Sequence, residues 1–451
     1  MTDPGWTAPE VGHDWRDEDV LRAVQWLKSF VPANAIEARL DRARETLLAA
    51  RAYWAKGEEA DPFDQADVAA WILLQCETFA TDRRFWVPEE MVRTVPYLTR
   101  IGKELDFLQS IPGADIRAER LMTTEKRQPE SGIYELLVAL AYKRRGWTKV
   151  EFVPEMPGSR RTPDLYVARP RSRWAVECKR LMPSNYERQE RATGKRLAAN
   201  VHALSLQLRR SLVVEVGYKC ELSDVPPEYL VDRVRDAISG RRGGRWDDPI
   251  SVGLARDVNW TLARRVLARD DVYFGSSRMI ELIVGRYAHD ADHSFRAKWS
   301  PAPERPTYAQ SVHQASVVSW WSLSSASQFR KARHFRSTLA NAEGQLPADR
   351  PGVIHVGVES RSGVGVDALR HIRNLIEARR FAPSASRLRW VYGNYFVPEV
   401  TTRRDETWAL IETMAPYRIG HHSTKWPLPG HMLLSPEDET REGVHWDKQR
   451  P

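Results

Sequence analysis

The sequence predicts an α/β fold in which helices flank a mixed sheet, preceded by an all-α N-terminal domain. In the middle of the chain, a helical period over 129–145 is followed by three strand-like segments, 149–156, 162–169 and 173–181. Over 14–110, in contrast, apolar residues recur at helical spacing throughout. At 451 residues, 42% of them hydrophobic, the chain is long enough to form two or three domains.

The predicted helical domain, residues 1–118, has an acidic surface. It contains fourteen Lys and Arg against twenty-one Asp and Glu, a net charge of −7. No group of residues within it suggests catalysis, so an interaction or autoinhibitory role is expected. A protein partner or a homodimer formed through this domain is left open.

The helix expected at 129–145 introduces the part of the chain that carries chemistry. Pro129 and Glu130 suit its first turn, and Gly146 suits its end. Glu135 lies among apolar residues of this helix, where a solvated position is hard to explain.

The two segments that follow the first strand alternate cleanly and predict a hairpin. With a two-residue turn at Pro170-Arg171, Asp164 lies opposite Glu177, and Lys179 lies one pleat further along the same face. Two facing carboxylates repel each other, and a divalent cation between them removes that penalty. Oxygen ligands of this kind suit Mg2+, or Mn2+ in its place. The alternative is an ordinary solvated face, since acid–lysine pairs are common on exposed strands.

The order and spacing of these residues over about 129–212 resemble the PD-(D/E)XK nuclease superfamily, which has the restriction-endonuclease-like fold. Its pattern is a helix with a Glu, here Glu135, a strand with Pro163-Asp164, and a strand with Glu177-Cys178-Lys179. The resemblance implies that Asp164 and Glu177 are metal ligands, that Lys179 is the catalytic lysine and that Glu135 is an accessory acid. It also implies Mg2+-dependent hydrolysis of phosphodiester bonds in nucleic acid, with DNA the expected substrate.

Positive charge is concentrated around this hairpin. Residues 143–196 contain fifteen Lys and Arg against six Asp and Glu, a net charge of +9. Four of these cations fall near the start of the next predicted helix and are expected to contact the phosphate backbone: Arg188, Arg191, Lys195 and Arg196. A nucleic-acid-binding or assembly module on the same fold, without turnover, is the alternative function.

Two helix–strand pairs are candidates for closing the nuclease core. The first is a helix from 186 to about 212 with the strand 212–219. The second is the helix 324–343 with the strand 352–359, which makes about 213–320 an insertion within a domain spanning 119–415. The second is favoured because its helix is basic. The Pro-rich segment 416–451 is expected to be a poorly ordered tail.

Two further motifs are not assigned a function. Residues 363–368, GVGVDA, match a dinucleotide-binding fingerprint, but Asp367 would place an acid near the pyrophosphate. The run 289–293, HDADH, has metal-ligand residue types, but it follows a predicted strand at 278–287 and is expected to be a polar turn.

The composition bears on location. No stretch approaches the length of a membrane span, and the first residues are acidic and polar. Three cysteines lie far apart in the sequence and suggest no disulfide framework. A cytoplasmic protein without membrane contact is therefore expected.

Overall fold

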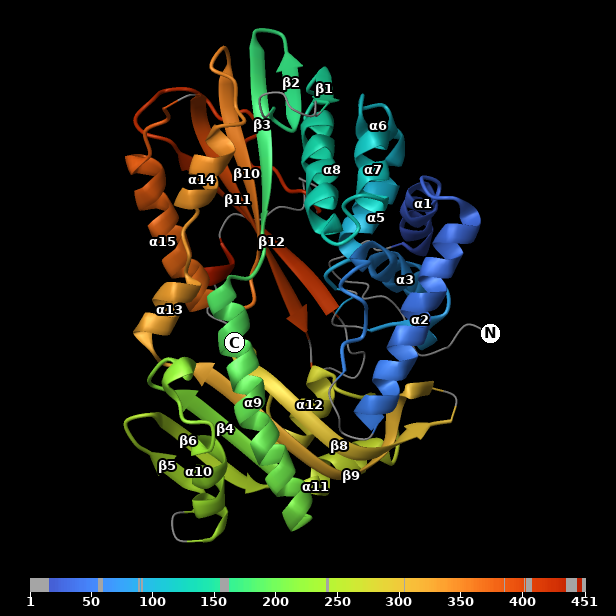
Figure 1. Cartoon of the computed structure of the whole chain (residues 1–451), viewed down its shortest axis with the longest axis vertical. Coiled ribbons are helices and arrows are strands. Elements are labelled where there is room, and N and C mark those ends of the chain that lie inside the picture. The colour runs from blue at the N-terminus through green and yellow to red at the C-terminus, as the bar shows by residue number, and fades with distance from the viewer. Residues whose placement is uncertain are drawn as a thin grey trace.

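The computed structural model describes residues 16–55, 60–87, 90, 92–154, 162–240, 243–303, 305–384, 386–400, 402, 408–434 and 444–447. It contains two mixed sheets, each covered by helices, and a group of N-terminal helices (Figure 1). Within the described residues, no helix combines the length and the apolar composition needed to cross a membrane.

The N-terminal region is helical, as predicted. Its elements are α1 (Asp17–Lys28), α2 (Ala33–Ala55), α3 (Val68–Ala80), η1 (Arg83–Phe85), α5 (Val95–Lys103), α6 (Leu105–Gln109) and α7 (Ala114–Met122). The acidic residues 17–19 stabilise the first turn of α1, where the helix dipole favours negative charge.

The first sheet contains the predicted hairpin. Its strands are β1 (Lys149–Phe152), β2 (Leu165–Arg169), β3 (Ser172–Leu181), β10 (Pro351–Glu359), β11 (Arg387–Val400) and β12 (Trp408–Arg418), in that spatial order. The strands β3, β10 and β11 are parallel neighbours, and the other pairs are antiparallel. Figure 1 shows α8 (Pro129–Arg144) on one side of this sheet and α14 (Arg336–Glu343) and α15 (Val364–Arg380) on the other.

The second sheet is built from the middle of the chain. Its strands are β4 (Leu212–Tyr218), β5 (Arg245–Asp247), β6 (Ser251–Asp257), β7 (Val272–Tyr273), β8 (Asp292–Ala302) and β9 (Arg305–Ser322). Its helices are α9 (Asn185–Leu208), η2 (Leu222–Asp224), α10 (Tyr229–Ile238), α11 (Trp260–Leu267) and α12 (Ser277–Val284). Separate clusters of buried residues line its two faces.

The later of the two candidate pairs joins the first sheet. Strand β10 pairs with β3, whereas β4 pairs with β6 and β9 in the second sheet, so the earlier alternative is wrong. The helix predicted at 324–343 is interrupted, forming α13 (Ser325–Lys331) and α14.

The chain enters and leaves the second sheet at neighbouring points. Helix α9 follows β3 and runs across the second sheet, and α13 follows β9 (Figure 1). The hydroxyl of Tyr186 donates to Ser327 Oγ at 2.8 Å, and Lys331 Nζ lies 2.8 Å from Glu190 Oε2. Side-chain contacts therefore hold the start of α9 against α13.

One hydrophobic core spans the N-terminal helices and one face of the first sheet. It contains Leu27, Leu98, Leu137 and Val176, and it also includes Leu433 from the C-terminal segment. The predicted boundary between residues 118 and 119 therefore has no break in packing. The amide of Phe152 in β1 donates to the carbonyl of Pro112 at 2.9 Å.

The C-terminal segment differs from the expected poorly ordered tail in the part that the structure describes. Leu428, His431, Leu433 and His445 are all buried there, the last in the short helix η4 (His445–Asp447). The carboxylate of Glu412 accepts from the amides of residues 433 and 434 at 2.9 Å. Sparse apolar residues are thus sufficient to attach this segment because buried polar groups add hydrogen bonds.

Candidate active site

The hairpin has the predicted register. Arg169 and Ser172 face each other across the turn, and the ladder ends with Leu165 opposite Val176. Asp164 and Glu177 are the next residues beyond this last pair. Arg171, the second residue of the turn after Pro170, has a φ of 64°, as a type II turn requires at that position.

The two faces of the hairpin meet different cores, as the alternation predicts. Val167, Trp174 and Cys178 lie in the core shared with α8, whereas Tyr166 and Ala175 face the core beneath α14 and α15. Glu177 alternates with Cys178 and therefore emerges on the α14 side.

Glu177 is a fully buried carboxylate with one satisfied and one unsatisfied oxygen. Its Oε1 accepts from Lys179 Nζ and from Gln345 Nε2, whereas its Oε2 has no hydrogen-bond partner. Burial raises the pKa of Glu177 to about 7, against the lowering effect of Lys179. An unsatisfied buried carboxylate oxygen is costly and is therefore a natural position for a cation.

Asp164 lies immediately before β2 and bonds to the neighbouring strand. Its Oδ2 accepts from the backbone amide of Cys178 at 2.6 Å, so the side chain binds the neighbouring strand just beyond the last backbone pair. Burial and the nearby carboxylates of Glu135 and Glu177 raise the pKa of Asp164 well above its usual range.

Glu135 reaches the same group of charges from α8. Arg117 of α7 donates to both of its carboxylate oxygens, with Nη2 2.9 Å from Oε1. Arg117 also lies 2.5 Å from Glu125, and its own side chain is buried. Burial raises the pKa of Glu135, and Arg117 opposes that rise.

Lys179 is held in its charged form. Burial by itself lowers the pKa of this ammonium, but the carboxylates of Glu177 and Asp164 outweigh burial and raise it. About a third of its side chain remains exposed, so the charge adjoins solvent.

The structure therefore brings Glu135, Asp164, Glu177 and Lys179 together. Within the described residues, no three His, Cys, Asp or Glu side chains are arranged as ligands of one ion. The two that fit a cation are Asp164 and Glu177, since their carboxyl groups lie near each other and Glu177 keeps an unsatisfied oxygen. Two protein carboxylates suffice for Mg2+ when water or phosphate supplies the remaining ligands.

The four cations predicted to contact nucleic acid lie on α9, away from this group. Arg188, Lys195 and Arg196 are exposed, whereas Arg191 forms an ion pair with Asp292 at 2.9 Å. Arg188 and Arg191 line a cavity between the two sheets.

Two residues of the group are not predicted by the sequence. Gln345 precedes β10, and Arg117 lies in the N-terminal region, and both contact the predicted acids only through the fold. The sequence suggests no more for loop 344–347 than a connection to the strand. Nothing in the sequence near residue 117 marks it out.

Comparison of the chain with models of known families, with curated proteins and with solved structures finds no match. The function is therefore argued from the residues themselves.

Proposed function

We propose that this protein is a metal-dependent nuclease that hydrolyses phosphodiester bonds, with DNA the expected substrate. The observation that carries the proposal is the buried carboxylate of Glu177, which keeps an unsatisfied oxygen beside Lys179 and lies near the carboxyl group of Asp164.

The balance of charge supports this function. Three largely buried carboxylates, Glu135, Asp164 and Glu177, gather around two cations, Arg117 and Lys179, and the pKa of each carboxyl is raised. A purely structural ion-pair network lowers carboxylate pKa values instead, because its cations outweigh burial. Raised values in a compact group of acids are typical of sites that take up a cation or transfer a proton.

The order of elements supports the same proposal. Helix α8, strands β1 to β3 and, after the second sheet, the parallel strand β10 form a mixed arrangement around the hairpin. This order agrees with the restriction-endonuclease-like core that the resemblance implies, with the second sheet as the insertion.

Each residue then has a distinct role. Asp164 and Glu177 would hold Mg2+ or Mn2+, which supplies a Lewis acid for the phosphate and lowers the pKa of bound water. Lys179, kept protonated by its two carboxylate neighbours, orients the attacking water and offsets charge that develops on the phosphate. Glu135 adds negative charge behind Asp164, and Gln345 fixes the orientation of Glu177.

The test is cleavage of plasmid, linear and single-stranded DNA, and of RNA, with EDTA, Mg2+ or Mn2+. Asp164→Asn, Glu177→Gln and Lys179→Met are each expected to reduce cleavage by at least about a hundredfold. Asp349→Asn is the matched control, because Asp349 is an exposed surface acid. Asp164→Asn should bind DNA at least as tightly as the unmodified protein, since one negative charge is removed.

A specific observation also favours the second candidate, a nucleic-acid-binding or assembly module without turnover. Lys179 and Gln345 already bind one oxygen of Glu177, and Arg117 occupies both oxygens of Glu135. Tight DNA binding with no cleavage under any metal condition would establish this alternative. Cleavage that persists in Asp164→Asn, in a preparation free of other nucleases, would contradict the site assignment.

A further inference from the structure

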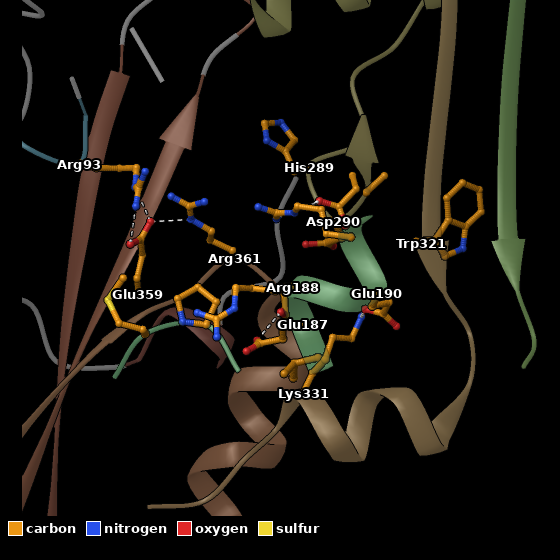
Figure 2. Close-up of a pocket in the computed structure, with 18 of the residues that line it drawn as sticks. Arg93, Glu187, Arg188, Glu190, His289, Asp290, Trp321, Lys331, Glu359 and Arg361 are labelled. Carbon is orange, nitrogen blue, oxygen red and sulfur yellow. Dashed lines mark hydrogen bonds and ion pairs between the residues drawn. The ribbon is translucent and has the colours of Figure 1, made fainter. Parts of the chain in front are cut away.

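A cavity of about 890 Å3 lies between the two sheets, at the ends of β3 and β10. Its walls come from the N-terminal helices, the start of α9, strand β9 and the loop before α15, and Figure 2 shows part of this lining. None of Glu135, Asp164, Glu177 and Lys179 lines it. The cavity is thus separate from these four residues, although two of the cations predicted to contact nucleic acid, Arg188 and Arg191, line it.

Three arginines share one carboxylate at its wall. Arg93 Nε and Arg361 Nε each donate to Glu359 Oε1 at 2.6 Å, and Figure 2 shows Arg93 and Arg361 approaching Glu359 from two sides. Arg180 Nη2 lies 3.8 Å from Glu359 Oε2. Glu90 adds a second carboxylate, 3.0 Å from Arg93. Glu130, which lines the same wall, is a third carboxylate close to Arg93 and Arg180. The three guanidinium groups are therefore matched in number by three carboxylates.

Arg180 has the longest carboxylate contact of the three arginines. Its side chain is only 6% exposed, it stacks over the ring of Phe396, and its Nη1 has no hydrogen-bond partner. A buried guanidinium nitrogen without an acceptor is costly, and Arg180 lines the cavity. An anion bound in the cavity would supply the missing acceptor.

The loop between β10 and α15 adds backbone donors beside the arginines. Residues 363–366 line the cavity, and α15 begins there without a side-chain cap. Gly363 has a φ of +89°, which a side chain rarely adopts. The amide groups at the start of a 17-residue helix favour a bound phosphate.

Asp367 does not oppose an anion here, although the sequence suggested that it would. Its carboxylate is buried and accepts from Ser360 and Arg370, and His445 Nε2 lies 3.0 Å from its Oδ2. The acid in the GVGVDA motif is therefore turned into the protein and neutralised there.

Other parts of the lining fit the rest of a nucleotide. Glu190 is 9% exposed and its Oε1 has no partner, so the cavity also offers an unused acceptor for hydroxyl or amino groups. Trp321 supplies half-buried aromatic surface in the same lining. Bases stack on such surfaces.

We propose that this cavity binds a nucleotide, with its phosphate at Arg180, Arg361 and the start of α15. The ligand is either a free mononucleotide or the 5′-phosphorylated end of a nucleic-acid strand, since both present the same group.

The test is binding to the full-length protein in EDTA, measured by calorimetry and by tryptophan fluorescence. The probes are inorganic phosphate, AMP, ATP, and a short oligonucleotide with a 5′-phosphate or a 5′-hydroxyl. Arg361→Gln removes one cation from the cluster. Gly365→Asp adds an anion where an added Cβ meets no atom within 4 Å, so folding is preserved, and Gly365→Ala is its matched control. Circular dichroism and Tm verify that each variant is folded.

AMP, ATP or the 5′-phosphorylated strand should bind, and Arg361→Gln and Gly365→Asp should each weaken binding by about tenfold or more. Gly365→Ala and Asp349→Asn should bind as the unmodified protein does. Because binding is measured in EDTA and needs no cleavage, this result stands even if the nuclease proposal fails. A preference for the 5′-phosphorylated strand over AMP and over the 5′-hydroxyl strand identifies the strand end as the source, and the reverse preference identifies a free nucleotide. Binding that neither charge variant alters, or no binding of any probe at millimolar concentration, would overturn the proposal.

Discussion

Replacing Glu177 with Gln should change how the stability of the protein depends on pH. Burial raises the pKa of this carboxyl from an ordinary value of 4.5 to about 7, and the side chain is fully buried. The difference corresponds to about 3 kcal/mol by which ionised Glu177 destabilises the folded state. Below pH 4.5 the group is protonated in both states and has no such effect. As the pH rises from 4.5 through 7, Glu177 ionises more readily in the unfolded state than in the folded state, and the free energy of unfolding falls.

The neutral amide of Glu177→Gln cannot ionise, so the variant escapes this loss. We expect its free energy of unfolding, relative to the unmodified protein, to rise by about 3 kcal/mol between pH 4.5 and pH 8. Urea unfolding followed by tryptophan fluorescence measures the difference at each pH. Mn2+ at pH 8 should stabilise the unmodified protein by mass action and leave the variant unchanged.

Glu359→Gln is the matched control for this experiment. Three arginines hold the pKa of Glu359 below its ordinary value despite burial. The contribution of Glu359 to stability changes only below pH 4.5. The free energy of unfolding of Glu359→Gln should therefore lie below that of the unmodified protein by the same amount at every pH from 5 to 8. If Glu177→Gln likewise differs from the unmodified protein by a constant amount over that range, Glu177 is not a destabilised carboxylate and the reasoning about the site fails.

Two further predictions concern Arg117 and helix α9. Arg117→Met should lower the free energy of unfolding by about 3–5 kcal/mol, because it leaves the largely buried Glu135 without its cation. In urea unfolding, the double variant with Glu135→Gln should recover most of that loss. Equal stability of Arg117→Met and the unmodified protein would show that the pair contributes little. Neutralising Arg188, Lys195 and Arg196 together should reduce the slope of log affinity for DNA against log salt by about 0.9 for each phosphate that the variant no longer neutralises. Arg191→Gln should have less effect, because Asp292 already pairs with it, and an unchanged slope in the triple variant would move the binding surface elsewhere.

Local patterns predicted the elements that carry the site. The alternation around Pro170-Arg171 determined which residues face each other, because a two-residue turn permits one register. Helix α8 and strand β10 lie within one residue of their predicted bounds. In each case the controlling signal lies within a few residues of the element.

The parts of the fold and site that the sequence did not predict depend on contacts between residues far apart in the chain. Gln345 reaches Glu177 from 168 positions away, and no local pattern encodes such a pair. The predicted strand at 278–287 is wrong, because residues 277–284 form α12. Short apolar runs fit either structure, and here the side chain of Ser276 caps the helix start while Gly285, with a φ of 87°, ends it.

The contacts that hold α9 against α13 also bear on the order of folding. Strands β3 and β10 are neighbours in the first sheet, yet residues 182–350 separate them in the chain, so pairing them directly would close a very long loop. The second sheet has its own cores and can form from within that segment. Once it has formed, Tyr186 and Ser327 lie within hydrogen-bond distance, and the effective loop shrinks to the four residues 182–185 and the 23 residues 328–350. Folding of the middle of the chain thus brings β3, which carries Glu177 and Lys179, close to Gln345 and the strand β10 that follows it.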